Sequence, residues 1–142
     1  MSSERRAGSA PPVGTEDART LMPWRVLSAL FLLAMGGIHL FLVLTGTGGL
    51  LGVLFVLNAV GSIALAVAVI VVRDRLVQVS VLGLLFVLGT LLALLIALSP
   101  LSLFGMRSSL SYQLAPTAIV VEAIGVIVLA ATVLLAARKR AG

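Results

Sequence analysis

Four polar side chains inside long apolar stretches are the residues of this chain that could do chemistry. They are His39, Asn58, Thr90 and Glu122, and each lies in a different stretch. In hydrocarbon a polar side chain is costly unless it has a partner, so it faces a bundle interior or a wet cavity. A carboxylate in such a place takes up a proton, which proton-coupled chemistry uses. Glu122 is therefore the strongest functional candidate; the structural alternative is a neutral Glu122, or a Glu122–His39 pair, that fixes helix packing.

The composition indicates which elements position these residues. Of the 142 residues, 61% are hydrophobic and only 11% are charged, and the mean hydropathy is +1.24. This composition is typical of a membrane protein. Each of four apolar stretches can cross a hydrocarbon layer about 30 Å thick at about 1.5 Å per residue. They cover approximately residues 24–45, 50–72, 76–98 and 114–137. The predicted fold is therefore all-α, an integral membrane four-helix bundle.

The chain divides into three predicted segments. Residues 1–22 are rich in Ser, Gly, Pro and charge and have no apolar period, so we expect a disordered cytoplasmic tail. Residues 23–138 form the predicted transmembrane domain, in which Pro23 suits the first helical turn. Residues 139–142 form a basic cytoplasmic tail. The first apolar stretch lacks a small-residue cleavage site, which predicts a retained anchor rather than a signal peptide.

The basic residues gather at one side of the predicted helices. Nine of the ten Lys and Arg residues precede the first helix, occupy the RDR turn at 73–75 or follow the fourth helix. Only Arg107 lies on the other side, in a predicted outer loop over residues 99–113, whereas TGTGG at 45–49 predicts a tight outer turn. This bias predicts that both termini are cytoplasmic. It also explains the net charge of +5 without a nucleic-acid partner.

The four polar residues are predicted to lie at one depth. Counted from the span limits, each sits about 5–6 Å to the outer side of the midplane. One polar group per helix at one depth predicts a single intramembrane polar layer. Small residues beside the layer favour close helix packing, as in the small-xxx-small pattern. The expected packing positions are Gly36, Gly37, Gly83 and Gly125.

A metal site and an active site are both disfavoured. Met35 and His39, four residues apart, could present a thioether and an imidazole to one copper ion. Two ligands on one helix are a weak indication of a metal site, and a methionine at such a position more often packs in the core. We therefore predict no cofactor. The chain has no cysteine, which excludes disulfides and thiolate metal sites. It also lacks P-loop, nucleophile-elbow and HExxH motifs, which makes an enzyme the least favoured class, although a lipid-facing site stays open.

Several short motifs carry a resemblance to a known group of proteins. These are GGIHL and GVLFVLN in the first two apolar stretches, FGMR in the outer loop and VEAIGVIVLA in the fourth stretch. The combination resembles small four-helix membrane proteins of actinobacteria, and the layout over residues 24–137 is similar to DoxX-like proteins. This resemblance implies a bacterial inner membrane location. Small multidrug exporters also have four short helices, but their essential glutamate lies in the first helix, where this chain has His39.

Three functional classes are consistent with the sequence. The first is an accessory or structural subunit of a larger membrane complex, which we favour because almost everything outside the polar layer is Leu, Val, Ala or Ile. The second is a small proton-coupled transporter or channel that uses Glu122 and His39 and is expected to be a homo-oligomer. The third is a redox or quinone-linked membrane protein that uses His39. The expected partners are the lipid bilayer and either a larger complex or further copies of the chain.

Overall fold

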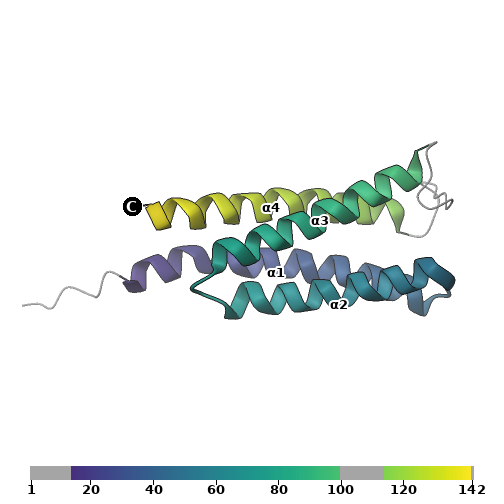
Figure 1. The fold of residues 1–142 in the computed structure, drawn as a ribbon, viewed down its shortest axis with the longest axis horizontal. Coiled ribbons are helices and arrows are strands. Elements are labelled where there is room, and N and C mark those ends of the chain that lie inside the picture. The colour runs from purple at the N-terminus through teal and green to yellow at the C-terminus, as the bar shows by residue number, and fades with distance from the viewer. Residues whose placement is uncertain (1–13, 100–113, 142) are drawn as a thin grey trace, which may run out of the picture.

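The chain folds into four helices (Figure 1). The computed structural model describes residues 14–99 and 114–141, with side chains from Thr20 onward. The helices are α1 (Gly14–Leu44), α2 (Gly49–Val71), α3 (Leu76–Leu98) and α4 (Ala115–Ala141). All four are long and apolar enough to cross a membrane. The prediction of an all-α protein with four potential transmembrane helices is therefore confirmed.

The helix bounds differ from the predicted segments at both ends. Helix α1 begins at Gly14, so part of the expected N-terminal tail is helical, and Pro23 lies inside the helix rather than in its first turn. Helix α4 continues to Ala141, so the basic residues after Ala137 extend the helix. The start of α1 and the end of α4 are rich in polar residues, so the continuous apolar pattern that predicted the helices does not extend to them. Residues 1–13 and most of the predicted outer loop, with Arg107 and Tyr112, lie outside the described residues.

Helix α1 is the central element of the bundle. It packs against both α2 and α4, whereas α3 packs mainly against α4 and to a smaller extent against α2. Figure 1 shows α3 crossing the bundle obliquely and the C-terminus of α4 at the same end as the α2–α3 turn. We call this the RDR end, after the turn at residues 73–75, and we call the end with the α1–α2 turn the TGTGG end. Because the connecting turns are short, α2 runs antiparallel to α1, and α3 runs antiparallel to α2.

The surface of the bundle is apolar on every helix. Large aliphatic side chains are exposed on each of the four, among them Leu30, Leu57, Leu85 and Ile127. Exposed apolar area this extensive is unfavourable in water and is normal for a surface that faces lipid. The surface is therefore compatible with a multi-pass membrane protein.

Glycines allow two close helix contacts. A Cβ at Gly36 would lie 2.8 Å from Ser62 Cβ, so α1 and α2 cross there without space for a side chain. A Cβ at Gly83 of α3 would lie 3.2 Å from Leu129 Cδ2 of α4, and one at Gly125 would lie 3.5 Å from Phe31 of α1. Gly36 and Gly83 are thus the two close contacts, whereas Gly125 leaves room for a Cβ. Gly83 and Gly125 both lie along the seam between α1, α3 and α4.

Gly37 does not take part in the contact expected for it. It is exposed, and a Cβ there would meet no atom within 4 Å. Neighbouring residues on a helix point about 100° apart, so when Gly36 faces α2 its neighbour faces away.

Replacing Gly36 by Ala tests the α1–α2 crossing. Gly36→Ala should lower the free energy of unfolding by about 1–3 kcal/mol, because overpacking forces the helices apart. Denaturation in detergent micelles would measure the change. The matched variant Gly37→Ala should alter stability by less than about 1 kcal/mol, and Gly36→Ala combined with Ser62→Gly should recover much of the loss. Equal effects of the two single variants would contradict the proposed contact.

A buried arginine of α1 closes the RDR end of α2. Arg25 is 5% exposed. Its Nε donates to Val69 O at 2.9 Å, and its Nη2 donates to Ile70 O at 2.5 Å and lies 3.4 Å from Val72 O. The last carbonyls of a helix have no partner within the helix, and a cation there also opposes the helix dipole. In the sequence Arg25 is one of the basic residues near the start of the first helix, and only the structure reveals that its side chain joins two helices.

Arg25→Met should therefore destabilise the bundle. The apolar stem is kept while the guanidinium donors are lost, and we expect about 2 kcal/mol less stability, since hydrogen bonds to charged groups contribute about 1.5–3 kcal/mol. Unfolding in detergent would measure this loss. Arg138 lies in the last turn of α4 and is exposed, so Arg138→Gln serves as the control with the same change in charge. A comparable loss in the control would show that net charge, and not the cap on α2, is responsible.

Candidate functional site

The four predicted polar residues all lie in the half of the bundle nearer the TGTGG end, but they form two groups. Glu122 of α4 and Thr90 of α3 face each other across the seam with α1. Their position follows from the contact one turn away, where Val87 packs against Gly125. His39 is buried on α1, and Asn58 is buried on α2. Helix α1, which carries His39, packs against both α2 and α4.

Met35 of α1 links Thr90 to the rest of the site. The Thr90 hydroxyl oxygen lies 3.3 Å from Met35 Sδ and 2.9 Å from Val87 O, and it also interacts with the Glu122 carboxyl. A hydroxyl has one proton to donate, so these three acceptors compete for it. When the Thr90 proton points to Val87 O, its oxygen is free to accept from a protonated Glu122. When Glu122 is ionised, the same hydroxyl can donate to the carboxylate. Thr90 can therefore serve both protonation states.

Glu122 keeps one oxygen without a partner. The side chain is 1% exposed, and Oε2 is buried with no hydrogen bond to any described residue. A buried polar atom without a partner costs about 1–3 kcal/mol, more when it is charged. Such atoms are rare in folded proteins and call for an explanation, such as a bound proton, ion or water. Glu122 is thus held in place by packing but is not fully satisfied.

His39 does not pair with Glu122. Within the described residues no ion pair joins them, and His39 Nδ1 lies 2.9 Å from Met35 O instead. A carbonyl can only accept, so Nδ1 carries the proton of this hydrogen bond. The imidazole also meets the Phe55 ring edge-on at a centroid distance of 4.9 Å. His39 therefore reaches Glu122 only through Met35 and Thr90: Met35 binds the imidazole with its carbonyl and Thr90 with its sulfur.

Asn58 belongs to the contact between α1 and α2. Ser62 Oγ donates to Asn58 O at 2.8 Å and lies 3.3 Å from Asn58 Oδ1. Ser62 is the residue that meets Gly36. Asn58 is therefore placed beside the helix crossing rather than in the group around Glu122.

Met35 and His39, the two residues considered as copper ligands, make contacts with other groups of the protein. Met35 Sδ lies next to Thr90, and His39 Nδ1 binds the Met35 carbonyl. In the part of the chain that the structure describes, no three His, Cys, Asp or Glu side chains come together as a metal site would require.

A second group of polar side chains lies in the half of the bundle nearer the RDR end. It was not predicted from the sequence. We call Ser28, Ser80 and Thr132 the inner hydroxyl layer. All three are fully buried, and the Ser28 and Thr132 hydroxyl oxygens lie 2.9 Å apart. These small hydroxyls fall on the same helix faces as Met35, Thr90 and Glu122, at separations of seven, ten and ten residues. That spacing was the available signal, because seven and ten residues are close to two and three helical turns.

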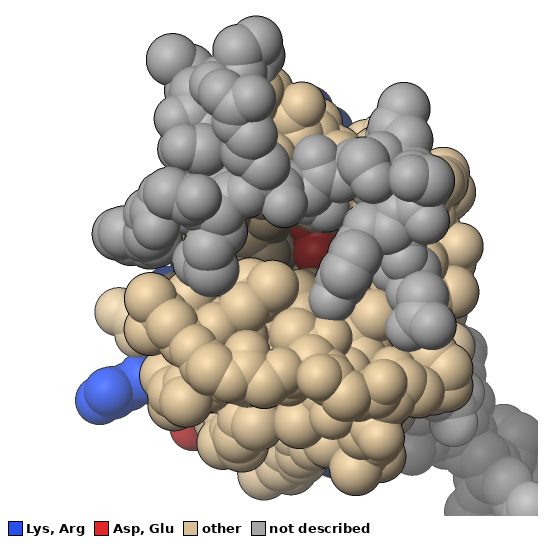
Figure 2. Space-filling view, turned by 90° about the vertical axis from the view of Figure 1, so that its right-hand side faces the viewer, with Lys and Arg blue, Asp and Glu red and all other residues tan. Residues whose placement is uncertain are grey.

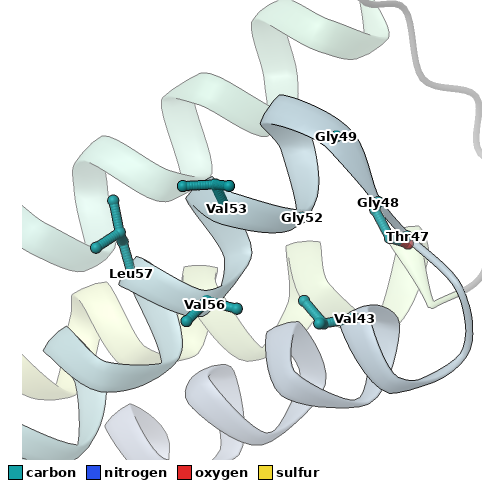
Figure 3. A pocket seen from close by; sticks show the side chains of 8 residues that line it. All are labelled: Val43, Thr47, Gly48, Gly49, Gly52, Val53, Val56 and Leu57. Atoms are coloured by element: carbon teal, nitrogen blue, oxygen red, sulfur yellow. The ribbon is translucent and has the colours of Figure 1, made fainter.

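At the TGTGG end an acidic side chain lies below the surface of the bundle. Figure 2 views this end and shows an acidic side chain recessed below its surroundings. Among the described acidic residues, Glu122 lies toward this end, whereas Asp74 lies in the turn at the RDR end. A separate shallow groove of 360 Å³ lies between Val43 of α1 and Val53, Val56 and Leu57 of α2 (Figure 3). Its walls are apolar apart from Thr47, so it offers little to bind a charged group.

Known proteins do not supply a function by similarity. Comparison with protein-family models, curated proteins and solved structures finds no match for this chain. The chemistry of the site is therefore the basis on which a function has to be assigned.

Proposed function

We propose that this protein spans the bacterial inner membrane four times, with both termini in the cytoplasm. The exposed apolar side chains on all four helices support a location in lipid. The basic residues of the RDR turn and of Arg138, Lys139 and Arg140 lie at one end of the bundle. An excess of Arg and Lys marks the cytoplasmic side of membrane proteins. The resemblance to DoxX-like proteins supports a bacterial inner membrane.

Reporter fusions test this topology. A fluorescent protein fused after Gly142 should be fluorescent in cells, because it folds in the cytoplasm. Alkaline phosphatase inserted in the α1–α2 turn, after Thr47, should be active, because it requires the periplasm. Active phosphatase at Gly142, or inactive phosphatase at Thr47, would reverse the orientation.

We infer that Glu122 binds and releases a proton within the bundle, and that the protein acts as a small proton-coupled transporter or channel. The observation that carries this inference is the buried Oε2 atom, which has no hydrogen-bond partner among the described residues. A carboxyl group retained only for packing would be expected to have both oxygens bound, since unsatisfied polar atoms destabilise the fold. Ionisable residues in membrane-spanning segments commonly mark ion pathways and proton relays. For this reason we favour the transporter class over the accessory class that the sequence alone favoured.

Thr90, Met35 and His39 have supporting roles in this proposal. Thr90 can accept from the protonated carboxyl and donate to the ionised one. Met35 fixes the position of Thr90 from α1. His39 orients this part of α1 through the Met35 carbonyl and acts as a positioning residue, because no ion pair connects it with Glu122 among the described side chains.

Glu122→Gln should abolish proton movement. The amide has nearly the same shape as the carboxyl group but does not exchange a proton. We expect proteoliposomes with the wild-type protein to dissipate an imposed pH gradient, and those with Glu122→Gln to match protein-free vesicles. A pH-sensitive dye inside the vesicles measures the rate.

Two further variants serve as controls. Ser62→Ala removes a buried hydroxyl from the α1–α2 contact without touching the carboxyl group and should keep the wild-type rate. Glu122→Asp keeps the exchangeable group and should keep part of the rate. Proton flux in a folded Glu122→Gln protein equal to that of the wild type would sink the proposal.

The accessory class remains the second candidate, and one observation favours it. Helices α2 and α3 make few contacts with each other, and exposed aliphatic side chains such as Val60 and Leu82 line their outer faces. A partner helix in the membrane could pack along them. Purification in mild detergent separates the candidates: a stable larger complex supports an accessory subunit, and an isolated homo-oligomer supports the transporter. Haem, copper or quinone in the purified protein would support the redox alternative.

A further inference from the structure

The inner hydroxyl layer is a second place where the seam of α1, α3 and α4 is polar. Thr132 Oγ1 donates to Val128 O at 2.9 Å and lies 3.5 Å from Trp24 O. The Ser28 hydroxyl is 2.9 Å from Thr132 Oγ1. Ser28 and Thr132 therefore satisfy each other.

Ser80 is the exception in this layer. Its side chain is fully buried and Oγ has no hydrogen-bond partner among the described residues. Its level in the bundle follows from the contact between Gly83 and Leu129. Ser80 lies three residues from Gly83 toward the RDR end, and Thr132 lies three residues from Leu129 in the same direction. The orphan hydroxyl is thus at the level of the Ser28–Thr132 pair.

We propose that the inner hydroxyl layer holds a water molecule, and that this water is the RDR-side station for the proton that Glu122 binds. Three hydroxyl oxygens on three helices offer the two to four partners that a buried water needs. The missing partner of Ser80 is what such a water would supply. The second half of the proposal rests on the proposed function of Glu122, whereas the water site does not.

An apolar plug separates the two polar groups along the seam. Leu32 of α1 and Leu129 of α4 are fully buried between them, with Val87 of α3 beside Gly125. Because Gly83 has no side chain, the end of Leu129 occupies the space in front of it. Apolar constrictions of this kind gate by excluding water. Movement of Leu129 would allow water to connect the two polar groups.

The proton transfer then balances without any other reactant. The O–H bond of the Glu122 carboxyl breaks, the proton passes to a water oxygen in the opened seam, and it leaves through the water at the inner hydroxyl layer. Glu122 is left as a carboxylate and takes up another proton from the TGTGG side. No electron is transferred.

Cysteine accessibility tests the water site directly, because the chain has no native cysteine. Ser80→Cys is nearly isosteric and should react in membrane vesicles with a small, membrane-impermeant methanethiosulfonate reagent added from the cytoplasmic side. Ala66→Cys is the matched control: Ala66 is 2% exposed and lies on α2, which contributes no residue to the inner hydroxyl layer. We expect Ser80→Cys to react several times faster than Ala66→Cys. Ser28→Cys repeats the test on α1 in case the α3 variant does not fold.

The outcomes separate the two halves of the proposal. Absence of labelling at both serine positions, or labelling no faster than at Ala66→Cys, overturns the water site. Leu129→Ala should raise the proton flux of proteoliposomes several-fold, and an unchanged flux overturns the plug. Labelling of Ser80→Cys should be the same when Glu122→Gln is present. If labelling persists but Glu122→Gln leaves the wild-type flux unchanged, the proposed function fails while the water site stands.

Discussion

Helix α1 supplies a polar partner to each of the other three helices, and the rest of the structure depends on these contacts. Arg25 binds the last carbonyls of α2, Met35 receives Thr90 of α3, and Ser28 pairs with Thr132 of α4. Lipid is as apolar as leucine, so helices in a bilayer gain little from hydrophobic burial against each other. Association then depends on close packing and interhelical hydrogen bonds. The most extensive packing joins α1 to α2 and α3 to α4.

Among the described residues, Glu122 and Ser80 are the two at which a buried side-chain polar atom lacks a hydrogen-bond partner. The surrounding helices supply the Thr90 hydroxyl but no partner for Oε2. Gly125 lies on the same face of α4, and a Cβ there would meet Phe31 and Val87 at an ordinary van der Waals distance of 3.5 Å. A carboxyl group that exchanges protons needs such incomplete satisfaction, since full bonding to one protonation state would trap that state.

The role of the single histidine changes once its contacts are known. As a sequence feature, His39 was a candidate relay, a copper ligand or a partner of Glu122. Its imidazole binds the carbonyl one turn earlier on the same helix and packs against Phe55. These contacts fix the local geometry of α1 beside Met35 and Gly36, where α1 approaches α3 and α2. His39 is therefore better understood as part of the frame that holds Thr90 in reach of Glu122.

The sequence by itself determined the four helices, their apolar character and the residues worth examining. Continuous apolar stretches fold as helices because in lipid every backbone polar group needs a partner within its own segment. The hydrogen bond from His39 to the Met35 carbonyl is also local, because the two residues are four apart and lie on the same side of one helix. The tertiary structure alone decided which helix faces meet. Gly36 and not Gly37 contacts α2, and Thr90 contacts Met35. Ser28 pairs with Thr132, which lies 104 residues further along the chain. Helical rotation and crossing geometry choose these pairs, and in chains rich in Leu and Val the apolar pattern is nearly the same on every face, so it carries no information about rotation.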